Sequence, residues 1–102
     1  MIKVAVLEDN KILCDRVVSV VREWNYVLEV VGFSTNEEFI VSDIVKEYDV
    51  LLVDLDLGGE TGETSIIYCS QLKNRNVSVI VMSASLNTKA ILSSIRAGAV
   101  GY

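Results

Sequence analysis

The sequence predicts an α/β protein with a doubly wound, five-stranded parallel sheet, and three observations lead to this fold class. Short runs of Val, Ile and Leu alternate along the chain with segments of helical periodicity. These runs are apolar nearly throughout, as in parallel strands that are buried on both faces. Proline is absent and the six glycines are too sparse to form a linker, so one domain is expected. Right-handed crossovers between parallel strands then place helices on both faces of the sheet.

The first half of the chain contains three predicted strands and two predicted helices. The first strand covers residues 2–7, and a second, β-branched strand covers residues 27–33. Between them, apolar residues recur with the spacing of one helical stripe, namely Leu13, Val17, Val20, Val21 and Trp24. The segment 35–47 starts with Thr-Asn-Glu-Glu, which has the form of a capping box and predicts a helix. A third strand covers residues 50–53 and ends at Asp54.

The second half of the chain continues the alternation. Glycines at positions 58, 59 and 62 mark a loop after the third strand. A weaker helical segment spans about residues 64–73, and a fourth strand covers residues 77–82 and ends at Ser83. The element order up to this point is that of consecutive β-α units of a parallel sheet.

The last predicted elements are a helix and the start of a strand. Asn87 or Thr88 can cap the helix, and Gly98 is placed as its left-handed terminator. Residues 100–102 begin a fifth strand. We therefore expect residues 1–102 to form one domain that is truncated at the start of strand 5 and lacks the last helix.

The composition excludes several classes of function. Fourteen Asp and Glu against nine Lys and Arg give a formal net charge of −5, which argues against direct contact of this domain with nucleic acid. The absence of His excludes imidazole catalysis and imidazole metal ligands. No apolar run is long enough to span a membrane. We expect a soluble, cytoplasmic protein in which Cys14 and Cys69 are reduced, partly buried thiols.

Polar side chains follow three of the predicted strands. Glu8 and Asp9 follow the first strand, Asp54 the third and Ser83 the fourth, and Asp56 comes two residues after Asp54. Because ligands of such sheets bind beyond the carboxyl ends of the strands, we expect three carboxylates and a hydroxyl to converge there. Oxygen ligands without Cys or His suit Mg²⁺. A carboxylate beside that ion can attack phosphorus as a nucleophile.

Each of these residues also has a purely structural explanation. Asp9 or Asn10 can cap the first helix, Asp56 can be an ordinary loop acid, and Ser83 can simply end a strand. Asp54 is harder to explain in this way, because a carboxylate directly after a buried strand risks burial without a partner. The functional interpretation therefore depends on the joint placement of these residues.

Five segments of the chain resemble the receiver domains of two-component response regulators. They are residues 4–10 (VAVLEDN), residues 48–57 (YDVLLVDLDL), Gly62, residues 79–84 (VIVMSA) and residues 97–102 (AGAVGY). The resemblance covers the whole chain, with the segments in the order and spacing of the family. It implies the flavodoxin-like receiver fold.

The resemblance also implies a phosphoacceptor site. Asp54 corresponds to the aspartate that accepts a phosphoryl group from a sensor histidine kinase, and it is also a metal ligand. Asp9 corresponds to a direct Mg²⁺ ligand, and Glu8 to the acid that helps to hold the ion, often through water. At Asp56 the family uses the backbone carbonyl as a ligand, so the side chain is not implicated.

Three further positions match the family's switch. Ser83 corresponds to the residue whose hydroxyl turns toward the phosphoryl oxygens, and Ala84 to a small residue that leaves access to the site. Tyr102 corresponds to the aromatic residue that changes rotamer together with Ser83. The resemblance thus implies a phosphoprotein that switches an output and is not itself an enzyme, with slow autodephosphorylation left open.

The output is inferred by analogy. The segment 97–102 is similar to the end of receivers that are joined to a C-terminal DNA-binding domain, so transcriptional control is the leading expectation. Gly58 stands where the family commonly has proline, which predicts a more mobile loop. The family's lysine at the end of strand 5 and its final helix match no residue here. We expect either a truncated domain or a chain whose open flank is covered by a second copy in a dimer.

Two rival functions remain at this point. In a haloacid-dehalogenase-like phosphatase, Asp54 would be the nucleophile, Asp56 the acid/base and Ser83 the hydroxyl that ends the next strand. That family usually opens with this motif, whereas here some fifty residues precede it, and only Lys89 follows as a candidate lysine. The second rival is a receiver-like interaction module that is never phosphorylated.

Overall fold

The computed structural model describes residues 1–82 and Gly98. In this part of the chain, four strands form one parallel sheet in the order β2-β1-β3-β4. The strands are β1 (Ile2–Leu7), β2 (Val27–Phe33), β3 (Val50–Asp54) and β4 (Ser78–Met82). The predicted fourth helix and fifth strand lie outside the described residues. Gly98 has a φ of 119°, a positive value that favours glycine.

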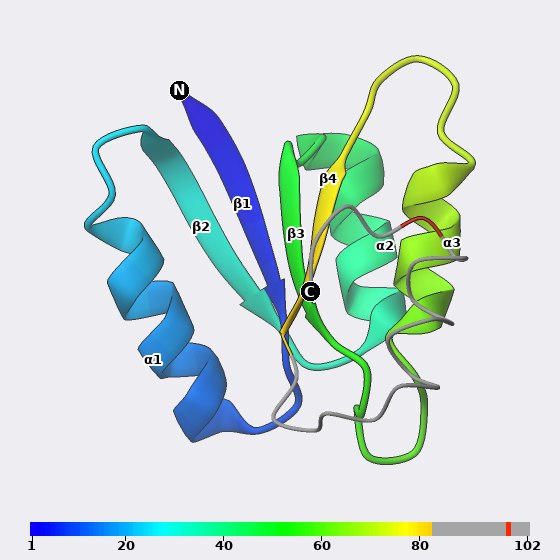
Figure 1. The fold of residues 1–102 in the computed structure, drawn as a ribbon, viewed down its shortest axis with the longest axis horizontal. Helices are drawn as coiled ribbons and strands as arrows, with labels where there is room; N and C mark the ends of the chain where they lie inside the picture. The colour runs from blue at the N-terminus through cyan, green and yellow to red at the C-terminus, as the bar shows by residue number, and fades with distance from the viewer. Residues whose placement is uncertain (83–97, 99–102) are drawn as a thin grey trace.

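Helices cover both faces of the sheet, which confirms the predicted doubly wound architecture (Figure 1). On one face lies α1 (Lys11–Arg22), and on the other lie α2 (Asn36–Lys46) and α3 (Glu63–Ser70). The chain passes from β1 to β2 on one side and then returns to β3 on the other side of β1. Strand order therefore reverses between β1 and β3, and their carboxyl ends are the expected place for a site.

Alternating side chains of the buried strands divide the core into two clusters. Val4 and Val6 of β1 pack in the cluster on the α1 face, whereas Ala5 and Leu7 pack in the cluster with α2 and α3. This explains why the strands read as continuous apolar runs, since both faces of the sheet are covered. The two free thiols are both buried, Cys14 in the α1 cluster and Cys69 in the opposite one.

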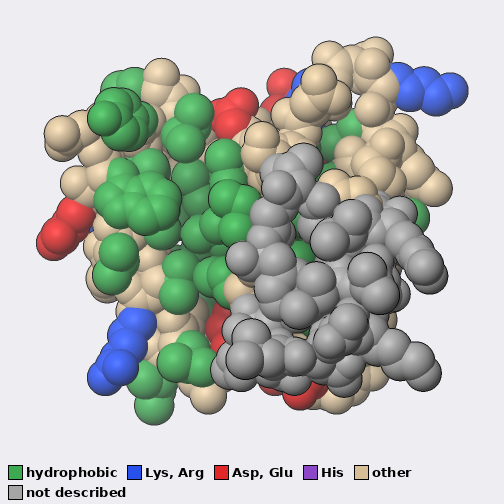
Figure 2. All heavy atoms as spheres, viewed as in Figure 1, with side chains coloured by type: hydrophobic (Ala, Val, Ile, Leu, Met, Phe, Trp, Pro, Cys, Tyr) green, Lys and Arg blue, Asp and Glu red, His purple; other side chains and the backbone are tan. Residues whose placement is uncertain are grey.

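The buried face of α1 differs from the predicted stripe. Val21 is buried and Val17 half-buried, but Cys14 and Val18 complete the face that meets the sheet. The other residues of the predicted stripe are Leu13, Val20 and Trp24, which are 48%, 60% and 50% exposed. Apolar residues surround more than half of this helix, so its periodicity fits two stripes equally well. Figure 2 shows the resulting hydrophobic surface on the α1 side of the molecule.

The predicted capping box at the start of α2 is confirmed in part. Thr35 is the N-cap, and its hydroxyl accepts a hydrogen bond from the backbone N–H of Glu38 at 3.2 Å. The carboxylate of Glu38 in turn accepts hydrogen bonds from the hydroxyls of Ser34 (2.7 Å) and Thr35 (3.1 Å). These hydrogen bonds lower the pKa of Glu38, and the bond from Ser34 has the largest effect. The helix thus begins where the sequence predicts.

A buried charged network lies at the end of the sheet where β3 begins. The Asp43 side chain is fully buried and pairs with the guanidinium of Arg75. It also accepts hydrogen bonds from the Tyr68 hydroxyl at 2.7 Å and from the Tyr48 backbone N–H at 3.0 Å. Arg75 donates a further bond to the carbonyl of Tyr48 at 2.8 Å. This network fastens α2, α3 and the segment before β4 to one another.

Among the helices that the structure describes, none has both the length and the apolar character needed to cross a membrane.

Candidate functional site

Three carboxylates meet at the carboxyl ends of β1 and β3. One carboxylate oxygen each of Glu8, Asp9 and Asp54 lies within 4.8 Å of the others. The parallel pairing of β1 with β3, in which Leu7 is opposite Val53, sets Glu8 beside Asp54. Asp54 is more than forty positions from Glu8 and Asp9 in the sequence, and the strand register brings the three together.

Asp9 is available for this cluster because its neighbour caps the first helix. The Asn10 side chain accepts a hydrogen bond from the backbone N–H of Leu13 at 3.1 Å, so Asn10 is the N-cap of α1. Of the two residues predicted as alternative caps, Asp9 therefore does not fill this role. Its side chain is exposed at the edge of the sheet.

Glu8 is held in a buried position at the centre of the cluster. Its backbone N–H extends the sheet pairing by donating to the carbonyl of Phe33 at 2.9 Å. Its side chain is only 6% exposed, and its Oε2 is buried without a hydrogen-bond partner in the described part of the chain. The pKa of Glu8 is raised to about 7. The main cause is burial of its carboxyl group, followed by a hydrogen bond with Asp54 and by the negative charges of Asp54 and Asp9.

The loop after β3 folds back over Asp54. The backbone N–H of Asp56 donates to Oδ1 of Asp54 at 3.0 Å, and Asp56 forms an antiparallel bridge with Thr61. The Asp56 carboxylate accepts from the backbone N–H of Gly58 at 3.1 Å, so this side chain is engaged within its own loop. Two further backbone bonds close the loop: Leu57 N to Glu60 O at 3.0 Å and Gly62 N to Leu55 O at 3.0 Å.

Glycine at two loop positions allows close approach to the acidic cluster. A Cβ at Gly62 would overlap the carbonyl oxygen of Asp54, and a Cβ at Gly58 would lie 3.2 Å from Oδ2 of Asp9. Gly58 also has a φ of 79°. Proline fixes φ near −65°, so it does not fit this backbone. The loop therefore spans the distance from Asp54 to Asp9 in a conformation that requires glycine.

The donors present fit a hard divalent cation. Two carboxylate charges about 5 Å apart repel each other by about 3 kcal/mol at an effective dielectric constant near 20. A bound cation would offset that repulsion and would provide a partner for Oε2 of Glu8, which has none among the described residues. All three side chains offer oxygen, without a nearby thiolate or imidazole in the cluster, and this donor set favours Mg²⁺ or Ca²⁺ over zinc.

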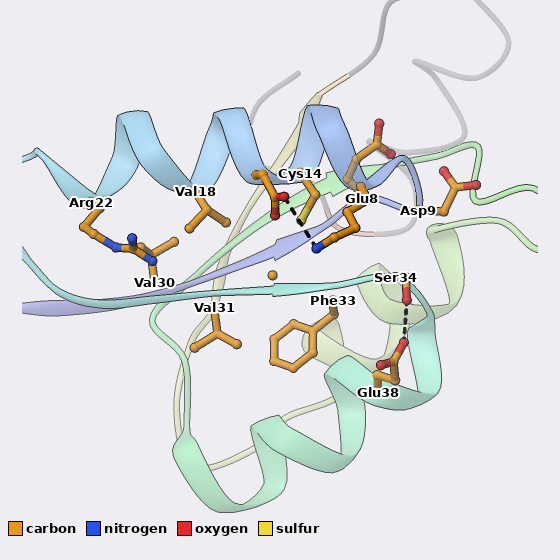
Figure 3. Close-up of a pocket in the computed structure, with 13 residues that line it drawn as sticks. Glu8, Asp9, Cys14, Val18, Arg22, Val30, Val31, Phe33, Ser34 and Glu38 are labelled. Atoms are coloured by element: carbon orange, nitrogen blue, oxygen red, sulfur yellow. Dashed lines mark hydrogen bonds and ion pairs between the residues drawn. The ribbon is translucent and has the colours of Figure 1, made fainter.

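A cavity of about 500 Å³ lies between α1 and β2 and borders this cluster. Figure 3 shows Glu8 and Asp9 at one end of it and Val18 and Arg22 toward the other. Asp54 does not line this cavity. Of the three clustered acids, Glu8 and Asp9 therefore border the cavity on the side of α1.

The remaining predicted site residues, Ser83, Ala84 and Tyr102, lie outside the described residues. The structure shows one further residue near the site that was not predicted from the sequence. Asn36, at the start of α2, is 5% exposed and hydrogen-bonds the loop that covers Asp54. Its sequence context, directly after a helix cap, gave no sign of burial or of a contact more than twenty positions away.

Comparison with known proteins identifies the family. The sequence model of the response regulator receiver domain matches residues 4–102. None of the curated proteins compared with the chain matches its sequence.

Solved structures of response regulators share the fold. A LuxR-family two-component response regulator from an Aurantimonas species has a TM-score of 0.88 and 17% identity, over 100% of this chain and 72% of that one. The phosphorylated cyanobacterial phytochrome response regulator RcpA has a TM-score of 0.84 and 23% identity, over 99% of this chain and 78% of that one.

A third structure is of a response regulator protein from Burkholderia pseudomallei with a phosphorylated aspartic acid, calcium ion and citrate. Its TM-score is 0.88 at 18% identity, and the match covers 100% of this chain but 58% of that one. At these identities the similarity concerns the fold.

Proposed function

The chain belongs to the response regulator receiver domain family, and we propose that its Asp54 accepts a phosphoryl group from a sensor histidine kinase. The observation that carries this proposal is the convergence of Glu8, Asp9 and Asp54, whose carboxylate oxygens lie within 4.8 Å of one another. Two structurally similar response regulators are phosphorylated, and the structure of one of them contains a phosphorylated aspartic acid and a calcium ion. The proposal therefore rests on the family, on the acidic cluster and on the position of Asp54 at the end of β3.

The proposed reaction is a direct transfer between two side chains. An oxygen of the Asp54 carboxylate attacks phosphorus, the bond from phosphorus to the kinase's histidine nitrogen breaks, and the products are an acyl phosphate and a free imidazole. The backbone N–H of Asp56 fixes the orientation of the acceptor by donating to Oδ1 of Asp54. Glu8, Asp9 and Asp54, with the Asp56 carbonyl, would hold Mg²⁺ at this site. This ion, when bound, neutralises charge that develops on the transferring group.

The switch residues are proposed from the family resemblance. Ser83 contacts the phosphoryl group, Ala84 leaves the site accessible, and Tyr102 changes rotamer with Ser83. The acyl phosphate carries about two negative charges at neutral pH in place of the single charge of the Asp54 carboxylate, and it presents additional acceptor oxygens. These changes can shift a balance between two conformations that differ by a few kcal/mol. The protein acts as a phosphoacceptor, with slow autodephosphorylation as a separate property to be measured.

The proposed partners follow from membership of the receiver domain family. A sensor histidine kinase donates the phosphoryl group, and a C-terminal DNA-binding output domain would carry the signal to transcription. LuxR-family regulators among the similar structures support that output. We propose a cytoplasmic location, no direct nucleic-acid contact by this acidic domain, and self-association through the exposed apolar surface beside α1.

Incubation with acetyl phosphate and Mg²⁺, followed by intact mass spectrometry, tests the acceptor. We expect one phosphoryl adduct per chain, lost in Asp54→Asn and retained in Asp56→Asn. The second variant is the matched control, because the Asp56 carboxylate bonds to Gly58 within its own loop. No adduct on the wild type would favour an inert interaction module. Hydrolysis of phosphate esters that depends on Asp56 would favour a haloacid-dehalogenase-like phosphatase.

A further inference from the structure

Asn36 links three elements around the candidate site. It is the first residue of α2, and its side chain lies between the loop after β3 and the first turn of α3. It is 5% exposed, and Ser65, its partner on α3, is fully buried. A buried primary amide is costly unless its polar atoms find partners, so the bonds of this side chain are informative.

The amide of Asn36 uses its full hydrogen-bonding capacity. Its Nδ2 donates to Oε1 of Glu60 at 3.0 Å and to the carbonyl of Thr61 at 2.9 Å. Its Oδ1 accepts from the backbone N–H of Ser65 at 3.2 Å and from the Ser65 hydroxyl at 2.6 Å. Two donor and two acceptor sites of the amide are thus filled.

Glu60 reinforces the same link. Its Oε1 also accepts the backbone N–H of Asn36 at 2.7 Å, so this loop carboxylate satisfies a free N–H at the start of α2. A negative charge is favourable at that end of a helix. The loop is therefore anchored to α2 by both the main chain and the side chain of Asn36.

A short path connects this anchor to the acceptor. Thr61, whose carbonyl binds Asn36, pairs with Asp56 in the antiparallel bridge. The backbone N–H of Asp56 in turn binds Oδ1 of Asp54. The loop between them contains Gly58 and Gly59, which lose more conformational entropy on ordering than other residues do. The contacts with Asn36 therefore add an anchor outside the loop to the hydrogen bonds within it.

We propose that Asn36 is a positioning residue that holds the Asp56 carbonyl and the Asp54 carboxylate in the geometry required for Mg²⁺ binding and phosphoryl acceptance. The inference rests on the proposed function and adds to it a residue outside the acidic cluster. Loss of outer-shell partners typically weakens metal binding by about 10- to 100-fold. Because Asn36 acts through two intervening residues, we expect a change near the lower end of that range.

Titration calorimetry of the full chain with Mg²⁺ tests the proposal. Asn36→Ala is expected to weaken Mg²⁺ binding about tenfold, and to slow labelling by acetyl phosphate at low Mg²⁺ but not at saturating Mg²⁺. The matched control is Tyr68→Phe, which removes a partly buried hydrogen bond to Asp43 at the opposite end of the sheet. The control is expected to lose stability while keeping wild-type Mg²⁺ affinity.

A second pair of variants keeps the test decisive if Asn36→Ala does not fold. Glu60→Gln retains an acceptor for Asn36 and is expected to bind Mg²⁺ like the wild type, whereas Glu60→Ala is expected to bind it more weakly. Unchanged Mg²⁺ affinity in Asn36→Ala or, failing that, in Glu60→Ala would overturn the inference and leave the proposed function intact. A wild type that binds no Mg²⁺ and accepts no phosphoryl group would overturn the proposed function and this inference with it.

Discussion

The backbone of Gly62 packs directly against the carbonyl oxygen of Asp54, and a methyl group at Gly62 would also lie 2.6 Å from Cγ2 of Val53. The end of the loop and the end of β3 are therefore in contact through main-chain atoms. This contact fixes the carboxyl end of the strand that bears the proposed acceptor. It also makes the loop after β3 sensitive to very small changes in side-chain volume.

Gly62→Ala is expected to lower the free energy of unfolding by about 2 kcal/mol, since the new methyl group forces backbone displacement in a packed region. Urea denaturation followed by circular dichroism measures this. Gly59→Ala is the matched control, because a Cβ at that position meets no atom of residues 1–82 or Gly98 within 4 Å. The control is expected to stay within about 0.5 kcal/mol of the wild type. Equal losses in the two variants would contradict the packing argument.

The stability of the metal-free protein is expected to fall as pH rises from about 4.5 to about 7. The unfolded chain releases the Glu8 proton near its ordinary pKa of 4.5, whereas the folded protein keeps it to about 7. Ionisation thus favours the unfolded state throughout this window. At about 1.4 kcal/mol per pKa unit, the loss amounts to about 3 kcal/mol when complete.

Denaturation in EDTA at about pH 5 and about pH 8 measures this loss, and Glu8→Gln is expected to remove most of the difference. The amide keeps the size of the side chain without its charge. An unaltered pH dependence in Glu8→Gln would show that other groups cause it.

Gly32→Ala is expected to destabilise the protein by about 1 to 3 kcal/mol through a clash with Cys14. A Cβ at Gly32 would lie 2.6 Å from the Cys14 sulfur, where α1 packs on β2. The double variant with Cys14→Ala is expected to be more stable than the sum of the two single changes, because the new methyl group occupies space that the sulfur leaves. Additive losses in thermal or urea unfolding would speak against direct contact between these positions.

Arg75→Met is expected to cost about 3 to 5 kcal/mol, since it leaves the fully buried Asp43 carboxylate without its countercharge. Lys11→Met offers a control on an exposed ion pair, in which Lys11 and Asp15 are 3.5 Å apart and 88% and 66% exposed. That change is expected to cost less than about 1 kcal/mol. Comparable effects of the two substitutions on urea unfolding would argue against a buried role for Arg75.

Much of the fold could be predicted from the sequence because the buried strands are nearly continuous apolar runs. β1 and β2 have the predicted bounds, and β3 extends the predicted strand by one residue, to Asp54. Helix α3 is shorter than predicted and ends at Ser70, before the segment from which Arg75 reaches Asp43. The buried face of α1 was predicted correctly for Val17 and Val21 but wrongly for Leu13, Val20 and Trp24, because apolar residues occur around more than one side of that helix. Periodicity alone cannot choose between two apolar stripes.

The candidate site also contains residues that the sequence predicted and one that it did not. Glu8, Asp9 and Asp54 were predicted together because parallel strands bring their carboxyl ends to one edge of the sheet. Asn36 was missed because its burial depends on the fold of the loop after β3, which is set by tertiary contacts. The roles of Ser83, Ala84 and Tyr102 stay predictions from the family.

The central sheet separates the two sulfhydryl groups of the chain, with Cys14 on one side and Cys69 on the other. Each can therefore serve as an independent reporter of transient opening in its own layer. The rates of thiol modification in single-cysteine variants would show whether the layers on the two sides of the sheet open together or separately.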